Sequence, residues 1–276
     1  MAPLAENRVR MLAGAMLVAL VLVYCINVLA GRGRVDARGD IIGCDFLAFY
    51  GAGLDVRAGR THLLYDLEHQ RRIQQPIARN PEWKYYYPFV NPPFYAAWVS
   101  PFAALPYVPA VFAWALTTLA AMLLSVGLLG RSLGFDRRTT LTAMLVALAF
   151  PASFMNLGGG QNAAFSLLLL TLCVVLQMRS RDLLAGLVLG LLLYKPQLVI
   201  TIAALWVVKG RWRSLAGLAV VGLALLLCGQ AGGVGRRLCA ESIKHLSKYW
   251  MDRHGSLLFI VLIGRLLDRF KFNHIG

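Results

Sequence analysis

The chain is organised around the stretch Gly43-Cys44-Asp45-Phe46-Leu47-Ala48-Phe49-Tyr50-Gly51-Ala52-Gly53, which sets one acid among apolar and aromatic residues. The stretch begins about a dozen residues after the first long apolar run ends, so we expect Asp45 to lie at a membrane surface. Seven of the thirteen carboxylates of the chain fall between Asp36 and Glu82. This concentration of acidic residues predicts that the segment binds a ligand or takes part in a reaction.

The composition around this stretch is that of a membrane protein. The 276 residues are 58% hydrophobic and 15% charged, with a mean hydropathy of +0.62. Apolar runs recur along the chain, many of them near the roughly 20 residues that cross a bilayer core. The net charge of +15 comes mostly from basic residues in short loops, a pattern typical of topology signals and anionic-lipid contacts. We therefore predict an all-α polytopic membrane protein that contacts membrane lipids and no nucleic acid.

The quoted stretch belongs to a predicted outer loop over residues 31–91, far longer than a connection requires. Within it, residues 63–77 alternate apolar and charged positions in the manner of an amphipathic helix lying along the membrane interface. Trp83 and the tyrosines 85–87 form a segment of an aromatic belt. We expect the loop to carry interfacial helices.

The rest of the chain is predicted to be membrane-embedded, as one domain over residues 1–276 with about eight spans and a short re-entrant helix over 94–105. The spans are Met11–Ala30, Val108–Gly130, Thr140–Phe154, Asn162–Met178, Leu183–Tyr194, Leu198–Val208, Leu215–Gly229 and Ser256–Leu267. The basic loops between them share one side under this parity, which predicts both termini in the cytoplasm. The two runs that flank Lys195 are short for ordinary crossings, so we expect broken helices whose ends line a cavity.

Asp45 is the strongest candidate for a catalytic residue. A carboxylate among apolar neighbours at a membrane surface can take a proton from a hydroxyl group, which makes Asp45 a candidate general base. Aspartate is also a favoured helix N-cap, so the alternative is that Asp45 caps a helix over residues 46–52. The two roles are compatible with each other.

Two cations are candidates for binding a phosphate group. Lys195 lies between two apolar runs and is followed by Pro196, and a charged side chain at such a break is costly unless it serves a function. The alternative is that Lys195 extends to the lipid headgroups. Arg57 is the second candidate, and a solvated or lipid-facing arginine is its alternative.

Gln161 and Asn162 follow Gly158-Gly159-Gly160 at a predicted helix start. Amides in that position can bind sugar hydroxyls, or they can cap the helix. The cysteines show no metal-binding spacing, and we predict neither a metal nor another cofactor. His245 and His254, in the last outer loop, are more simply explained as interfacial side chains than as catalysts.

Several short motifs occur in an order and at a spacing that resemble glycosyltransferase family 87. They are Asp45-Phe46-x-x-Phe49-Tyr50-x-Ala52-Gly53, Leu64-Tyr65-Asp66, Tyr87-Pro88, Pro92-Pro93-Phe94, Leu105-Pro106, Gly160-Gln161-Asn162, Ala185-Gly186-x-x-Leu189-Gly190 and Lys195-Pro196-Gln197. The chain departs from the family pattern at Asn91, where the family usually has tyrosine, and at His254-Gly255-Ser256. Family members commonly continue through further spans, so the resemblance also raises the expectation of a C-terminally shortened relative.

The resemblance implies the GT-C fold, in which a helical bundle supports a long first outer loop. It implies an inverting hexosyltransferase that moves mannose, or a related sugar, from a polyprenyl-phosphate donor to a lipid or glycan acceptor on the periplasmic or extracellular face. Asp45 matches the base of the family, while Lys195 and Arg57 are assigned to the donor phosphate. The motif positions Tyr50, Asp66, Gln161, Asn162 and Gln197 are assigned to substrate binding.

Two other functions remain as alternatives. One is a transporter or flippase of a lipid-linked sugar, whose broken helices would hold the cargo. The other is an inactive, truncated relative. The long outer loop favours chemistry at the membrane surface over transport.

Overall fold

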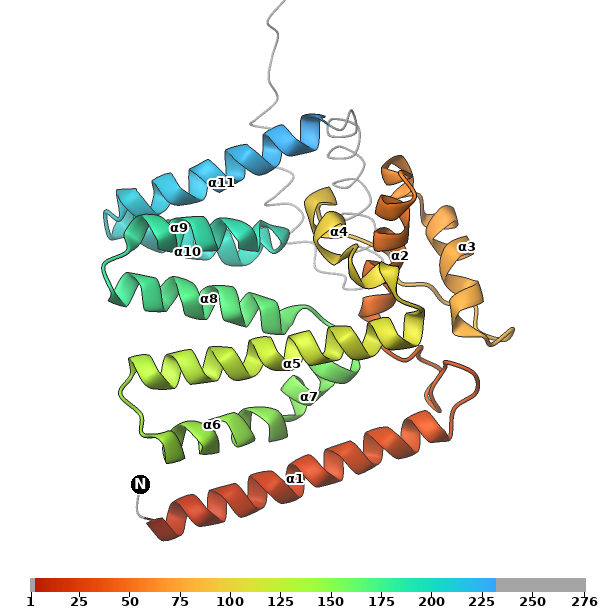
Figure 1. Cartoon of the computed structure of the whole chain (residues 1–276), viewed down its shortest axis with the longest axis horizontal. Coiled ribbons are helices and arrows are strands. Elements are labelled where there is room, and N and C mark those ends of the chain that lie inside the picture. The colour runs from red at the N-terminus through yellow and green to blue at the C-terminus, as the bar shows by residue number, and fades with distance from the viewer. Residues whose placement is uncertain (1–2, 232–276) are drawn as a thin grey trace, which may run out of the picture.

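The computed structural model describes residues 3–231 of the chain, and over this range it contains helices and no strands. The predicted all-α membrane protein is therefore confirmed. The helices form two groups. One is a bundle of elongated helices lying side by side, and the other is a set of short helices, α2 to α4, at one end of that bundle (Figure 1).

The bundle consists of α1 (Pro3–Leu29), α5 (Tyr107–Ser132), α6 (Arg137–Ala149), α7 (Pro151–Gly158), α8 (Ala163–Met178), α9 (Asp182–Gly190) with the 3₁₀ turn η3 (Leu191–Tyr194), α10 (Pro196–Val208) and α11 (Trp212–Ala231). Two of these helices, α1 from Glu6 onward and α5, are long and apolar enough to cross a membrane. The pair α6 and α7 makes a third if it counts as one bent span. The count of eight spans stays a prediction, and the last of them, Ser256–Leu267, lies outside the described residues.

The span predicted over residues 140–154 is wrong as a single helix. The chain bends by 64° between α6 and α7. Pro151 follows Phe150, whose backbone is extended at φ −71° and ψ 123°. Proline lacks an N–H and disfavours a helical residue before it, so α6 ends at Ala149 and α7 starts in a new direction.

One end of the bundle, which we call the basic end, carries the N-terminus and the loops around Arg131, Arg138, Arg179 and Arg211 (left in Figure 1). Ion pairs join helices at this end: Arg138 lies 3.2 Å from Glu6 of α1, and Arg211 lies 2.8 Å from Asp182 of α9. These basic loops lie at one end of the bundle (Figure 1), and the side of the membrane that this end faces stays a prediction.

The bundle helices reach very different distances from the basic end. At 1.5 Å per residue, α5 is about 39 Å long and α8 about 24 Å, while α9 with η3 and α10 are about 20 Å each. Helices α8, α9 with η3 and α10 are therefore much shorter than α5. The short helices α4 (Pro93–Val99) and α2 (Asp45–Arg57) lie at the end of the bundle opposite the basic end (Figure 1), where Tyr95 of α4 packs against Tyr194 of η3.

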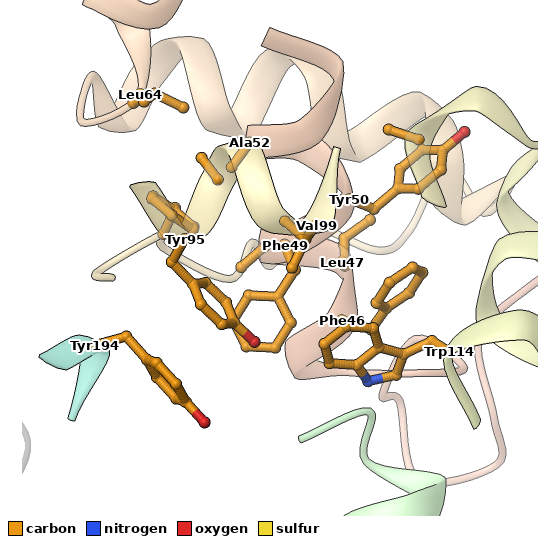
Figure 2. Close-up of a cluster of buried hydrophobic side chains, with 14 of the residues drawn as sticks. Phe46, Leu47, Phe49, Tyr50, Ala52, Leu64, Tyr95, Val99, Trp114 and Tyr194 are labelled. Carbon is orange, nitrogen blue, oxygen red and sulfur yellow. The ribbon is translucent and has the colours of Figure 1, made fainter. Parts of the chain in front are cut away.

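Helix α2 is the central element of the loop segment. Every residue from Phe46 to Gly53 is buried, as is Asp55. An aromatic cluster surrounds its first turns (Figure 2). The Phe46 ring lies 5.2 Å from the Trp114 ring of α5, and the Phe49 ring lies 5.3 Å from the Tyr95 ring of α4. The first helix of the loop is thus built into the protein core.

Helix α3 (Leu67–Ala78) follows the turn η1 (Thr61–Leu63) and is the amphipathic helix predicted over residues 63–77. Its buried positions are Gln70, Gln74 and Ala78, one turn apart. The Gln74 amide donates to the Tyr87 carbonyl and accepts from the Tyr87 N–H, each at 2.8 Å. The Gln70 amide oxygen accepts from the Phe89 N–H at 2.8 Å. These amides hold the extended segment before α4 much as a neighbouring strand would.

Helices α9 and α11 pack at unusually short range. A Cβ atom on Gly186 would lie 1.9 Å from the Ser214 carbonyl oxygen, and one on Gly217 would lie 2.3 Å from the Leu183 carbonyl oxygen. Only glycine permits such an approach of two backbones. This contact fixes the position of α9, and with it η3 and Lys195.

Candidate functional site

The candidate site is built where α2 begins. Cys44 precedes the helix with a φ of 26°, and Asp45 is the first helical residue. The N-cap position therefore belongs to Cys44, which makes no side-chain capping bond, and the reading of Asp45 as the cap is wrong. A carboxylate in the first turn of a helix is still stabilised by the positive end of the helix dipole.

A glycine turn between α7 and α8 approaches this helix start. The Asp45 N–H donates to the Gly159 carbonyl at 3.0 Å. Gly160 has a φ of +65°, and a Cβ there would lie 2.3 Å from the Gly43 carbonyl oxygen and 2.7 Å from the Phe46 Cβ. Glycine is therefore required for both the backbone conformation and the contact. Gly160 thus lets this turn lie against the start of α2.

Lys195 lies between η3 and α10 and is partly buried. Burial lowers the pKa of its ammonium group, while the negative charge of Asp45 acts in the opposite direction and raises it. The carboxylate and the ammonium are thus close enough to interact, although they lie far apart in the sequence. The structure brings together the two residues that sequence analysis assigned to catalysis and to the donor phosphate.

The amides near this pair differ in their surroundings. Asn162 is buried at the start of α8, where it makes no capping bond, and its side chain lies beside the Tyr95 hydroxyl. The Ala163 N–H is instead bound by the Asn156 side chain at 3.2 Å. Gln161 is exposed next to Asn162, and Gln197 is exposed in the first turn of α10. Gln161 and Asn162 directly follow the glycine turn in the sequence, and Gln197 lies two residues after Lys195.

Three other predicted residues lie elsewhere. Arg57 is exposed at the last position of α2, about 18 Å along the helix from Asp45. Asp66 caps α3 by accepting from the His69 N–H at 2.9 Å. Tyr50 is buried, and its hydroxyl donates to the Leu105 carbonyl at 2.9 Å. The structure gives Asp66 and Tyr50 structural contacts and does not bring Arg57 to Lys195.

Sequence analysis missed a buried ionic cluster between α2 and α3. Asp55 is 1% exposed, and one of its carboxylate oxygens lies 3.0 Å from the Arg60 Nε and 2.9 Å from the His69 Nε2. Asp55 and His69 lie on different helices, so their spacing in the sequence does not predict that they are in contact. The cluster stabilises the packing of α3 against α2.

A pair of contacting tyrosines was not predicted either. The rings of Tyr95 and Tyr194 lie 4.8 Å apart, and the Tyr194 hydroxyl lies 3.0 Å from the Ser166 hydroxyl of α8. Tyr194 precedes Lys195, so this hydrogen bond fixes Lys195 relative to the start of α8. Among the described residues, no group of three or more His, Cys, Asp or Glu side chains is placed to hold a metal ion.

Comparison with known proteins identifies the family. The model of glycosyltransferase family 87 matches residues 89–237, which include the glycine turn, Tyr95 and Lys195 but not Asp45. No curated protein and no solved structure matches the chain. The matched region covers more than half of the chain and contains most of the residues that surround Asp45, and on this evidence the protein belongs to glycosyltransferase family 87.

Proposed function

We propose that this glycosyltransferase moves mannose, or a closely related hexose, from a polyprenyl-phosphate donor to a lipid or glycan acceptor. The observation that carries the proposal is that residues 159–166 contact both Asp45 and the neighbour of Lys195: the Asp45 N–H donates to the Gly159 carbonyl at 3.0 Å, and the Ser166 hydroxyl lies 3.0 Å from that of Tyr194. The charge of Asp45 also raises the pKa of Lys195, so a carboxylate base and a phosphate-binding cation could act on one substrate pair. The family membership supports sugar transfer as the reaction class.

Asp45 acts as the general base. Its carboxylate accepts the proton of the acceptor hydroxyl as the acceptor oxygen attacks the anomeric carbon of the donor sugar. The bond between the anomeric carbon and the phosphate oxygen breaks, and polyprenyl phosphate leaves with the bonding electron pair. Attack from the side opposite the leaving phosphate inverts the configuration at the anomeric carbon.

Lys195 stabilises the leaving phosphate. An ammonium group that burial has partly deprived of water gains more from a bound anion than an exposed one does. Since the phosphate is already a good leaving group, positioning and charge stabilisation suffice, and the proposal requires no metal. Gln161, Asn162 and Gln197 are proposed to bind hydroxyl groups of the substrates, because they adjoin the glycine turn or Lys195 in the sequence. The positions of Arg57, Tyr50 and Asp66 do not support a role for them in substrate binding.

The short helices around Lys195 suit a lipid-linked donor. Lys195 lies between η3 and α10, so a phosphate bound by its ammonium group would lie at the end of two short helices, with the polyprenyl chain extending into the membrane. This arrangement supports a GT-C-like organisation, in which short loop helices cover the working end of a bundle. It also supports placing the reaction on the face opposite the basic end, which is the periplasmic or extracellular face.

The test is sugar transfer by purified protein from radiolabelled polyprenyl-phosphate mannose to membrane lipids, with Asp45→Asn as the variant. Losing a general base should lower the rate roughly 100- to 10,000-fold. Asp40→Asn is the matched control, because Asp40 is exposed five residues earlier and its carboxylate accepts from the Tyr87 hydroxyl at 3.0 Å, a role that an amide oxygen can keep. Turnover near that of the parent in folded Asp45→Asn would remove Asp45 from the mechanism. Donor binding without transfer by the parent would favour a transporter or an inactive relative.

A further inference from the structure

Trp114, in the first third of α5, connects this helix to the glycine turn beside Asp45. The side chain is 2% exposed, and its indole N–H donates to the Gly160 carbonyl at 2.9 Å. The preceding carbonyl, that of Gly159, accepts from the Asp45 N–H at 3.0 Å. Two successive carbonyls of one turn therefore bind α5 on one side and the first residue of α2 on the other.

The indole ring reinforces the same connection. It stacks on Phe46, the residue after Asp45, at 5.2 Å and an interplanar angle of 29° (Figure 2). It also lies 5.1 Å from the ring of Phe165 in the first turn of α8. Trp114 thus contacts α2, the glycine turn and α8 at the point where the three meet.

The start of α8 also determines where Lys195 lies. Ser166, in the first turn of α8, holds the Tyr194 hydroxyl at 3.0 Å, and Tyr194 precedes Lys195. The segment 159–166 therefore binds Asp45 at one end and the neighbour of Lys195 at the other. Because this segment joins the two, a change in its conformation would change the separation of the two charged groups.

We infer that Trp114 is a positioning residue of the transfer reaction, and that its indole N–H fixes the glycine turn and thereby the separation of Asp45 from Lys195. The inference rests on the proposed roles of these two residues. Trp114 itself does not touch the substrates. Its contribution is geometric, and a displacement of about 1 Å at a reacting group can lower a rate on the order of 100-fold.

The experiment compares Trp114→Phe with the parent in steady-state transfer from polyprenyl-phosphate mannose. The variant keeps an aromatic ring and loses the N–H donor. We expect kcat to fall about 10- to 100-fold while KM for the donor changes less than about threefold. The matched control is Trp83→Phe, because Trp83 is buried and its indole nitrogen has no hydrogen-bond partner. The control should retain the kcat of the parent.

A second measurement is independent of transfer activity. The rate at which Lys195 reacts with an amine-selective reagent, followed by peptide mass spectrometry as a function of pH, reports its pKa. Since the charge of Asp45 raises this pKa, moving Asp45 away in Trp114→Phe should shift the reactivity profile to lower pH. The profile in Trp83→Phe should match that of the parent. Should the parent transfer no sugar at all, the proposed function fails, while the Lys195 profile still tests the coupling.

An isosteric substitution addresses folding. Incorporation of 3-benzothienylalanine at position 114 replaces the N–H by sulphur and preserves the shape of the ring system, so it tests the donor alone if Trp114→Phe does not fold. Loss of kcat together with a shifted Lys195 profile supports the inference. Folded protein that lacks the N–H donor yet keeps the parental kcat, or the parental Lys195 profile, overturns it.

Discussion

Asp45 and Lys195 both lie at interruptions of regular backbone structure. Asp45 follows a residue with positive φ, and Lys195 is flanked by a 3₁₀ turn and by Pro196. Helix ends leave backbone N–H and C=O groups without intrahelical partners, so polar groups and ligands are accommodated there at lower cost than within a span. The site is therefore formed from two helix starts, those of α2 and α10.

Lys195 should be essential for donor use and dispensable for folding. Lys195→Met removes a partly buried charge, so we expect donor use to fall strongly while thermal stability stays level or rises. Lys195→Arg should retain part of the activity, because a single point contact depends on charge more than on shape. Transfer kinetics and thermal unfolding measure the two effects.

Lys209→Met is the control for that experiment, since Lys209 is exposed at the other end of α10. It should transfer sugar like the parent. If Lys195→Met binds and uses the donor as well as the parent does, the side chain only extends to the lipid headgroups.

Cys44 should be unusually slow to react with alkylating reagents. Burial, followed by the charge of Asp40, raises the pKa of its thiol from 9.0 to about 11. At pH 8 roughly one thiol in a thousand is then ionised, and the alkylation rate should rise about tenfold per pH unit up to pH 11. The raised pKa also means that the folded state holds the proton more tightly, so this group loses stabilising free energy as pH rises from 9 to 11.

The measurement uses a variant that keeps Cys44 and has the other four cysteines replaced. The reference is Ala37→Cys, an exposed position, in a variant in which all five native cysteines are replaced. The reference thiol should react about tenfold or more faster at pH 8. Equal rates for the two thiols at pH 8 would contradict the raised pKa.

Residue types and motif spacing single out Asp45 and Lys195 as candidates, because an acid or a lysine in apolar surroundings stands out in any sequence, and their roles stay predictions. They could not predict the contacts of Tyr50 or Asp66. Whether a tyrosine hydroxyl meets a substrate or the Leu105 carbonyl depends on how distant segments pack. The sequence does not indicate a role for Trp114 either, because a tryptophan in an apolar helix is common. Its role depends on the glycine turn that it contacts in the folded protein.

At the scale of helices, the contact between α9 and α11 is the most demanding in the described part of the chain. Gly186→Ala would place a methyl group against the backbone oxygen of Ser214, so the two helices must separate. Overpacking typically costs about 1–3 kcal/mol, and we expect a loss at or above the upper end because backbone yields less than a side chain. Thermal unfolding in detergent measures the loss.

Gly14→Ala provides the comparison, since a Cβ at Gly14 of α1 meets nothing within 4 Å. It should leave stability unchanged or raise it by about 0.5–1 kcal/mol. Similar unfolding temperatures for the two variants would contradict the packing described for α9 and α11.

Apolar length predicted most helices to within a few residues, as α5 and α8 illustrate, because a run of apolar residues bounded by arginines has few other structures in a membrane. It failed at Pro151, where one residue divides a predicted span. It also did not predict that α2 is buried within the protein. The burial depends on the aromatic side chains of α4 and α5, which are contributed from more than forty residues later in the chain.

At the scale of the whole molecule, the basic end predicts orientation. The loop at residues 31–91 should face the periplasm or the exterior, and the loop 179–181 should face the cytoplasm, since basic loops are retained inside. In a cysteine-free background, Asp40→Cys should react with an impermeant maleimide in intact cells. Ser180→Cys should react only after permeabilisation, and the reverse result would mean that the topology is inverted.

The unequal helix lengths have a consequence for the surrounding lipid. A bilayer core is about 30 Å thick, and helices of about 20 Å such as α9 with η3 and α10 are too short to match it. Lipids respond to such hydrophobic mismatch by thinning beside the short helices, which draws headgroups and water toward the protein at that place. The thinned annulus would lie next to Lys195, so the phosphate of a lipid-linked sugar would meet the ammonium group without crossing the full depth of the hydrocarbon. The shortness of these helices thus shapes the membrane as well as the protein.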